Sequence, residues 1–253
     1  MKLIEFRNVS KRFGRQVVLD RISLQVNEGE SLVIIGASGS GKSVMLKHMV
    51  GLLCPDSGEV SFDGHRIDQL SERELDELRI NFGFLFQQGA LFDSMSVEEN
   101  VAFPLVEHTK KPPQEISRLV DEKLRMVGLP HVRKKMPAEL SGGQRKRVAL
   151  ARAIAMSPRA ILYDEPTTGL DPIRSDVINE LILKLKHELN VTSVVVTHDM
   201  HSAFKVADRI VMLHEAHIIF DGTADELRSS DNPVIQRFVS GRAGDEELAG
   251  LRE

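Results

Sequence analysis

The sequence contains a single cysteine and no long run of apolar residues. Cys54 has no partner for an internal disulfide, which indicates a reducing compartment. Next to Pro55 in a predicted turn, it is interpreted as unreactive. No apolar run approaches the roughly 20 residues needed to cross a bilayer, and the charges of Glu5 and Arg7 near the N-terminus argue against a signal peptide. We therefore expect a cytoplasmic protein that reaches a membrane only through a partner.

The sequence also has no excess of basic residues. The 33 lysines and arginines against 37 acidic residues give a formal net charge of −4, whereas a nucleic-acid-binding protein needs a basic surface for the phosphates. A nucleic-acid partner is therefore not expected. With 42% hydrophobic and 28% charged residues, the 253-residue composition is typical of one large globular domain or two small ones. We find no internal repeat in it.

Hydrophobic patterning predicts an α/β core with helices inserted between its strands. The continuous apolar run 31–36 is typical of a buried parallel strand. Further strands are expected at 3–9, 22–26, 58–64, 160–164 and 192–198, with a helix at 43–53, another at 177–190 and a hairpin at 209–222. From about Gln88 to Met156 the pattern is helical, and over 114–128 the apolar residues fall on one face.

Several helix boundaries are readable from short-range signals. Ser71 with Glu74, and Ser96 with Glu99, have the spacing of a capping box. Another capped helix is expected near Thr223. Gly128 is a predicted helix stop, because glycine adopts the left-handed conformation that ends many helices.

Residues 36–43, "GASGSGKS", fit the phosphate-binding pattern G-x-x-x-x-G-K-[ST], with a predicted strand before and a helix after. The glycines let backbone N–H groups face phosphates, Lys42 should reach the β/γ-phosphates, and the Ser43 hydroxyl should bind Mg²⁺. A glycine-rich turn with a solvated lysine is the alternative. The predicted ATP-binding residues are Gly36, Ala37, Ser38, Gly39, Ser40, Gly41, Lys42 and Ser43.

Acidic and polar side chains follow the predicted strands beyond this loop. Asp164 is expected in the Mg²⁺ shell, and Glu165 is expected to polarise the water that attacks the γ-phosphate, although both could simply belong to a strand-ending turn. His198 is predicted to contact the γ-phosphate, or else to orient a helix start. Gln87 is either a sensor of the nucleotide and metal or a polar loop residue.

Two further helix starts carry candidate roles. Asp171 before Pro172 has the pattern of an N-cap followed by proline at the first helical position. Ser141 precedes a glycine pair at the start of a long basic helix, where free backbone N–H groups and the helix dipole can hold an anion. The basic run of that helix, Arg145, Lys146 and Arg147, is interpreted as a solvated face.

In order, "GASGSGKS", Gln87, "LSGGQ", "ILYDEP", "GLDP" and "VTHD" resemble the ATPase subunit of ABC transporters over nearly the whole chain. The resemblance implies a P-loop α/β core with an antiparallel β subdomain and an inserted helical subdomain. It implies one domain over 1–240, with 1–87 and 158–240 as the core, 88–157 as the helical subdomain, and a polar tail at 241–253.

The same resemblance implies a head-to-tail dimer that encloses two ATP molecules. The signature residues Ser141, Gly142, Gly143 and Gln144 would face the ATP bound to Lys42 of a second copy, and Asp171 would lie at the dimer contact. Phe13 would stack on adenine, or else belong to a small core near the first strand.

Residues 86–109 are similar to the Mla-type ATPases, which move phospholipids with a permease and an MCE substrate-binding protein. Apolar residues of this segment, from Ala90 to Leu105, are expected in the helical core or in a groove for the permease. The C-terminal tail is shorter than in that family.

Together with these resemblances, the motifs predict an Mg²⁺-dependent ATPase that powers lipid transport as a dimer of itself. The expected partners are an integral membrane permease, an MCE protein and a small accessory subunit, at the cytoplasmic face of the inner membrane. A non-transport ATPase that regulates cell-envelope machinery is the alternative. A repair ATPase would need a long heptad insertion, and a translation factor a second tandem domain.

Overall fold

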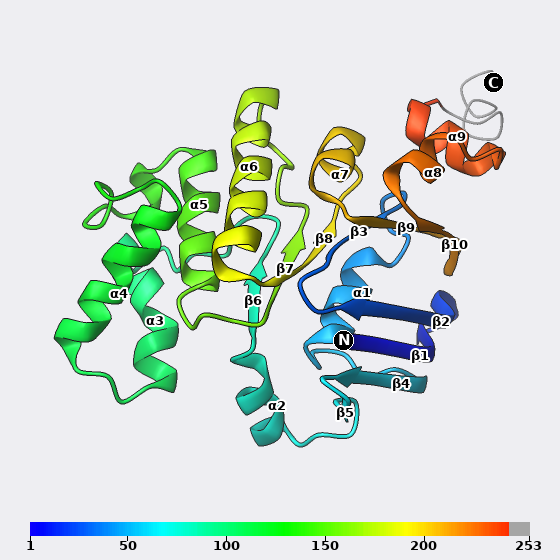
Figure 1. The fold of residues 1–253 in the computed structure, drawn as a ribbon. Coiled ribbons are helices and arrows are strands. Elements are labelled where there is room, and N and C mark those ends of the chain that lie inside the picture. The colour runs from blue at the N-terminus through cyan, green and yellow to red at the C-terminus, as the bar shows by residue number, and fades with distance from the viewer. Residues whose placement is uncertain (243–253) are drawn as a thin grey trace.

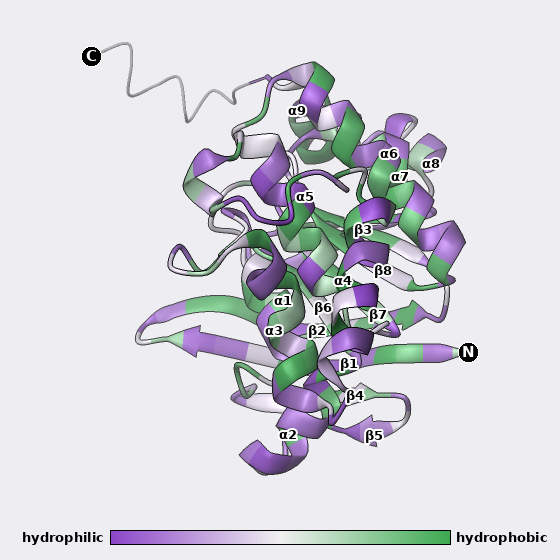
Figure 2. Ribbon diagram, turned by 90° about the vertical axis from the view of Figure 1, so that its left-hand side faces the viewer, coloured by the Kyte–Doolittle hydropathy of each residue, from purple (hydrophilic) through white to green (hydrophobic). Residues whose placement is uncertain are grey.

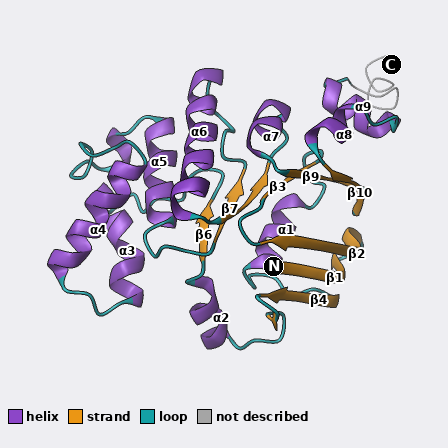
Figure 3. Cartoon of the chain, viewed as in Figure 1, coloured by secondary structure: helices purple, strands orange, loops and turns teal. Residues whose placement is uncertain are grey.

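The computed structural model describes residues 1–242 and contains two β-sheets with helices around them (Figures 1 and 3). The predicted tail 241–253 therefore lies outside the described residues except for its first two. The larger sheet has the order β10-β9-β3-β8-β7-β6, and the smaller has the order β2-β1-β4-β5. The strands are β1 Lys2–Phe13, β2 Gln16–Asn27, β3 Ser31–Ile35, β4 Ser57–Phe62, β5 His65–Arg66, β6 Phe82–Leu85, β7 Ala160–Asp164, β8 Thr192–Val196, β9 Arg209–His214 and β10 His217–Gly222.

The larger sheet is parallel from β6 to β9, and β10 returns antiparallel to β9 as the predicted hairpin. Every residue of β3 and β8 is buried, as expected for strands covered on both faces. Because the strands are parallel, β3, β7 and β8 all deliver their C-terminal ends to one edge of the sheet. The predicted phosphate loop, acidic pair and histidine follow these three strands.

Nine α-helices are described within residues 1–242. They are α1 Lys42–Met49, α2 Glu72–Arg79, α3 Val97–His108, α4 Pro113–Met126, α5 Gly142–Ala153, α6 Pro172–Leu189, α7 Met200–Val206, α8 Ala224–Arg228 and α9 Pro233–Ser240, with a 3-10 turn at Pro137–Glu139. Helices α3, α4 and α5 lie between β6 and β7 in the chain and group together on one side of the molecule (Figure 1). The boundaries 88–157 of the helical subdomain stay a prediction.

Two hydrophobic cores meet at the larger sheet, and alternate residues of one strand enter different cores. Val33 and Ile35 of β3 pack in the core shared with α3 to α6, whereas Leu32 and Ile34 pack in the core shared with α1 and the smaller sheet. Figure 2 shows the contrast between these apolar strands and the hydrophilic α2 at the periphery. The phosphate loop thus follows a strand that is fixed from both sides.

The short-range predictions of helix boundaries are confirmed. Capping boxes form at Ser71, Ser96 and Thr223, and Gly128 has the left-handed φ of 69°. The helix predicted over 43–53 ends earlier, at Met49. Gly51 follows with a φ of 64°, and a Cβ at that position would lie 2.5 Å from Leu75 Cδ2, so α2 packs where the helix would otherwise continue.

Candidate functional site

The loop 36–41 leaves β3 and leads directly into α1, and two of its glycines are required by close backbone contacts. A Cβ on Gly36 would lie 2.3 Å from the carbonyl oxygen of Leu213 in β9. At Gly41, which caps α1 with a φ of 103°, a Cβ would lie 2.8 Å from the Val18 carbonyl oxygen. Only glycine fits these positions, so the loop is held against both sheets, while Ala37, Ser38 and Gly39 between them are exposed.

Lys42 is buried and turns back over this loop. Its Nζ donates to the carbonyl oxygens of Gly36 at 2.8 Å and Ala37 at 2.9 Å. Burial lowers the pKa of Lys42, and the nearby Glu165 and Asp164 carboxylates oppose that effect. A cation with little access to water, beside the free N–H groups of a helix start, forms a site suited to phosphate oxygens.

Ser43 and Asp164 bring two oxygen ligands together from different elements. Ser43 Oγ, in the first turn of α1, donates to Oδ1 of Asp164 at the end of β7, at 2.9 Å. Burial raises the pKa of Asp164, while the Ser43 hydroxyl opposes the rise. A hydroxyl and a carboxylate beside a phosphate site are ligands that Mg²⁺ prefers, so these residues fit the metal. Gln87 is exposed and lines the same cavity.

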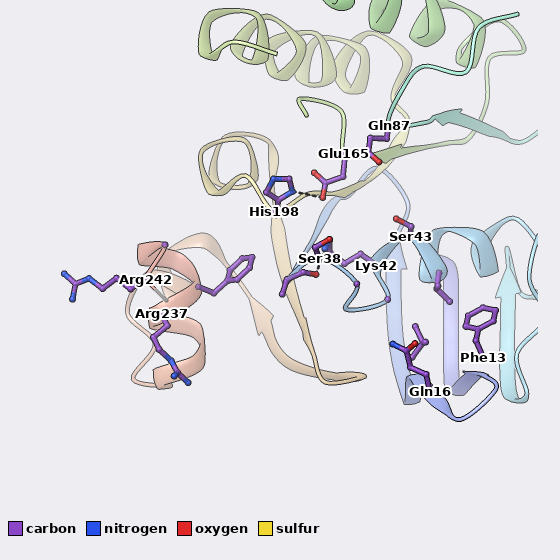
Figure 4. Close-up of a pocket in the computed structure, with 17 residues that line it drawn as sticks. Phe13, Gln16, Ser38, Lys42, Ser43, Gln87, Glu165, His198, Arg237 and Arg242 are labelled. Atoms are coloured by element: carbon purple, nitrogen blue, oxygen red, sulfur yellow. Dashed lines mark hydrogen bonds and ion pairs between the residues drawn. The ribbon is translucent and has the colours of Figure 1, made fainter. Parts of the chain in front are cut away.

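Glu165 has a backbone conformation that is unusual for its residue type, with a φ of 50°. Its Oε1 lies 2.9 Å from Nδ1 of His198, and its Oε2 accepts a hydrogen bond from the Thr168 hydroxyl at 3.0 Å. The Glu165 side chain is largely buried, whereas that of His198 is 59% exposed. Figure 4 shows both side chains above the phosphate loop. The carboxylate is therefore oriented on both oxygens at the mouth of the site.

A cavity of about 920 Å³ joins these groups. Phe13 is 47% exposed and lines it from the smaller sheet. Arg237 and Arg242 line it from the C-terminal region, at the end away from Phe13 (Figure 4). No motif in the sequence connects these arginines or Thr168 to the loop, so the sequence does not predict them as site residues. The predicted residues that line the cavity are Phe13, Ala37, Ser38, Gly39, Gly41, Lys42, Ser43, Gln87, Glu165 and His198.

The signature turn is absent from the lining of this cavity within the described chain. The Ser141 hydroxyl caps α5 by accepting from the Gln144 N–H, and the Gln144 side-chain oxygen accepts from the Ser141 N–H. A Cβ on Gly142 or Gly143 would meet no atom closer than 3.7 Å. The chain itself therefore gives no steric reason for the glycine pair.

The prediction that Lys146 belongs to a solvated basic face is wrong. Its side chain is only 6% exposed, and its Nζ donates to the carbonyl oxygens of Glu165, Pro166 and Thr168. Arg145 is exposed and Arg147 is half-buried. Three consecutive residues span about 200° of a helix, so they cannot all face solvent when the helix packs on a neighbour.

Asp171 has the predicted position at a helix start. It caps α6 by accepting from the Arg174 N–H, with Pro172 as the first helical residue. Ile173 follows with 79% of its surface exposed. The structure therefore places Asp171 and an exposed apolar side chain together at one end of α6.

A glycine-rich loop between a buried parallel strand and a helix, with an acidic pair at the end of a neighbouring strand, defines a P-loop nucleotide-binding protein. Comparison with known families is consistent with this class. Residues 19–168 match the ABC transporter family. The chain belongs to this family and is an ABC-type ATPase that binds ATP.

Relatives of known name align over almost the whole chain. The MlaF ATP-binding proteins of intermembrane phospholipid transport systems are 44% identical in Haemophilus influenzae and 42% identical in Escherichia coli K12, over 95% of this chain and 91% and 90% of theirs. The ATP-binding protein mkl of Mycobacterium leprae, named for ribonucleotide transport, is 45% identical over 94% of this chain and 69% of its own.

Solved structures show the same fold. The dimeric post-hydrolysis structure of the ATP-binding cassette MJ0796 with ADP and Pi matches with a TM-score of 0.81 and 36% identity, over 87% of this chain and 98% of that one. The structure of cbiO1 from Clostridium perfringens matches with a TM-score of 0.84 and 31% identity, over 99% and 98%. The predicted fold class is thereby confirmed.

Within residues 1–242, no helix has the length and apolarity required to pass through a membrane.

Proposed function

We propose that two copies of this chain bind head to tail, enclose two ATP molecules, and couple their hydrolysis to phospholipid transport through a membrane permease. The observation that carries the dimer is the position of the glycine pair. Gly142 and Gly143 begin α5 where a Cβ would make only ordinary van der Waals contacts, at 3.7 and 3.8 Å, and they do not line their own chain's cavity. Such a turn suits a phosphate that a second copy brings to it.

In each composite site, the loop residues 36–43 and Lys42 would bind the β- and γ-phosphates. Ser43, Gln87 and Asp164 would hold Mg²⁺, which neutralises phosphate charge when it is bound. Phe13 would stack on the adenine at the far end of the cavity. From the other copy, Ser141 to Gln144 would approach the γ-phosphate, and Asp171 would lie at the contact between the two chains.

Hydrolysis would require a water molecule that transfers a proton to Glu165 as it attacks the γ-phosphate. The carboxylate is oriented by Thr168 and His198, and His198 would also contact the γ-phosphate. Closing the second copy over the site removes water. Two unit charges about 4 Å apart interact by roughly 1 kcal/mol in water but about 4 kcal/mol at an effective dielectric near 20, so the same donors stabilise the transition state more strongly. A single copy would bind ATP and hydrolyse it poorly.

An aromatic groove of about 390 Å³ supports the permease as a partner. Phe86 and Phe92 are 39% and 41% exposed, and the Phe92 ring packs against Phe103 with 4.8 Å between centroids. Asp76 and Arg152 add charged groups to the lining. A mainly apolar lining that also contains charged groups suits an amphipathic helix presented by an integral membrane protein.

Phospholipid is the proposed cargo because this chain aligns with nine-tenths of the MlaF proteins, whereas it covers about two thirds of mkl. We propose an MCE substrate-binding protein and a small accessory subunit as further partners. The protein would then work at the cytoplasmic face of the inner membrane. Purifying the chain from membranes and identifying the co-purifying integral proteins and bound lipid tests this assignment; ribonucleotide without lipid would contradict it.

The dimer is tested with Glu165→Gln, which keeps the size of the side chain but removes the proton acceptor. This variant should bind ATP and elute at twice the monomer mass in size-exclusion chromatography with ATP, but at the monomer mass without it. Lys42→Ala is the control that should remain monomeric with ATP. A Glu165→Gln protein that stays monomeric in saturating ATP would contradict the proposed sandwich.

A further inference from the structure

Three backbone carbonyl groups of the segment after β7 converge on one ammonium group. Lys146 Nζ lies 3.2 Å from the Glu165 oxygen, 2.7 Å from the Pro166 oxygen and 2.8 Å from the Thr168 oxygen. A lysine ammonium has three N–H donors, so each donor has an acceptor. The contact joins α5 to residues about twenty positions later in the chain.

The three carbonyl groups belong to the segment that begins with Glu165, whose backbone conformation is unusual. A non-glycine residue with a φ near 50° is held there by its surroundings. Three carbonyl oxygens that point at one place also repel each other unless a cation lies between them. Thr168 links the two halves of the arrangement, because its carbonyl accepts from Lys146 while its hydroxyl donates to Glu165 Oε2.

Lys146 also lies close to the signature turn along the same helix. Five residues separate it from Ser141, a rise of roughly 7.5 Å along the helix axis. Any shift or rotation of α5 that follows the binding of a phosphate at its N-terminus must therefore act on the three carbonyl contacts. Those contacts belong to the chain's own reaction centre and not to that of the partner.

We propose that Lys146 is a positioning residue that holds the Glu165–Thr168 segment in its reactive conformation, and that it transmits the state of the signature helix to Glu165 of the same chain. The first half of this proposal concerns the structure of the single chain. The second half rests on the proposed dimer, because only there does a phosphate reach α5.

The first test uses Lys146→Met, with Lys123→Met as the matched control. Lys123 is also a buried lysine, 3% exposed, but it lies on α4 and donates to Glu122 and Ser157. Hydrogen–deuterium exchange is measured in the nucleotide-free protein on peptides that cover residues 163–172. Loss of the contacts to a charged donor should speed exchange there roughly tenfold in Lys146→Met, with no change in Lys123→Met. Unchanged exchange in Lys146→Met would overturn the proposal.

The second test separates chemistry from binding. Lys146→Met should lower kcat about 10- to 100-fold, as expected for a displaced reacting group, while KM stays within about twofold and Lys146→Arg restores most of the rate. In the Glu165→Gln background, Lys146→Met should still form the ATP-dependent dimer. A kcat within about twofold of wild type, or loss of that dimer, would overturn a positioning role. If wild-type protein hydrolysed no ATP at all, the proposed function would fail, and the exchange comparison would still decide the role of Lys146.

Discussion

The Nδ1 atom of His198 lies 2.9 Å from Oε1 of Glu165, at the ends of the neighbouring parallel strands β8 and β7. When Nδ1 of a histidine pairs with a carboxylate, Nε2 is available for another contact. The His198 side chain is 59% exposed and lines the cavity. One ring can therefore orient the carboxylate and face a γ-phosphate at the same time.

We predict that His198→Ala lowers kcat about 10- to 100-fold, because Glu165 loses one of its two orienting contacts and the phosphate loses a donor. Phosphate release measured at saturating ATP checks the rate, and nucleotide titration should show ATP affinity much closer to wild type. Asp199, which caps α7 through the His201 N–H, stays intact in this variant. Wild-type kcat in His198→Ala would show that the pair has no part in hydrolysis.

The glycine pair of the signature turn leads to a second prediction. A Cβ on Gly143 would come no closer than 3.8 Å to Arg174 Cδ, and alanine is the better helix former by up to about 1 kcal/mol. Gly143→Ala should therefore not lower the melting temperature, but it should reduce ATP-dependent dimerisation and ATPase activity because the added methyl group crowds the turn that the partner's phosphate has to approach.

Thermal unfolding and size-exclusion chromatography with ATP check this pair of expectations. Gly83→Ala is the contrast, since its Cβ would lie 2.6 Å from the Ala153 carbonyl oxygen; it should lower the melting temperature of the monomer. A Gly143→Ala protein that is unstable as a monomer would mean that the chain itself requires the glycine.

The third prediction concerns sites shared between two chains. Lys42→Ala should abolish tight ATP binding in its own loop, and Ser141→Arg should block the signature turn. A mixture of the two inactive variants forms heterodimers in which one composite site keeps both of its halves. ATP hydrolysis should return to part of the wild-type rate on mixing, whereas inactivity at every ratio would count against sites formed in trans.

The aromatic groove yields the fourth prediction. Phe92→Glu places a charge beside Phe103 in the groove lining, where an apolar partner surface would have to cover it at a cost of several kcal/mol. The variant should no longer co-purify with an integral membrane protein. Leu52→Glu, at an apolar residue that is 50% exposed outside the groove, should still do so. Equal recovery of the permease with both variants would place its contact elsewhere.

Features that depend on a few neighbouring residues can be predicted from the sequence, whereas contacts that depend on tertiary packing cannot. The capping boxes at Ser71 and Ser96, and the left-handed Gly128, follow from bonds between residues three or four positions apart. The buried β3 was readable from its continuous apolar run. The strands that pair with β3 are harder to predict, because β8 and β9 lie more than 150 residues away from it in the chain.

For the candidate site, the motifs predict the phosphate loop and the acidic pair, but not the side chains that pack around them. The basic run predicts a solvated Lys146, because it gives no sign of the carbonyl groups that accept from this side chain. Arg237 reaches the cavity wall only through the fold of the last helices. Such contacts bring together residues that carry no common pattern, so only the three-dimensional arrangement reveals them.

The last prediction is a pH dependence that separates activity from stability. Burial lowers the pKa of Lys146 to about 8 from the ordinary 10.5, and the Glu165 carboxylate partly opposes the shift. Above pH 8 the neutral amine has two N–H groups for three carbonyl oxygens, so kcat should fall as the pH rises through 8. Lys146→Arg keeps its proton across this range and should lack that step. Because Lys42, whose pKa is also lowered by burial, is present in both proteins, the comparison isolates the effect of Lys146.

The effect on stability has the opposite sign. Between pH 8 and 10.5 the unfolded chain holds the Lys146 proton and the folded chain does not, so the contribution of this group to the free energy of unfolding rises with pH. The difference in unfolding free energy between wild type and Lys146→Met, measured by urea denaturation, should therefore grow in favour of wild type over this interval while the wild-type kcat declines. A group that only stabilised the fold through its charge would lose stability and activity together. Parallel pH profiles for the two quantities would therefore contradict the role given to Lys146.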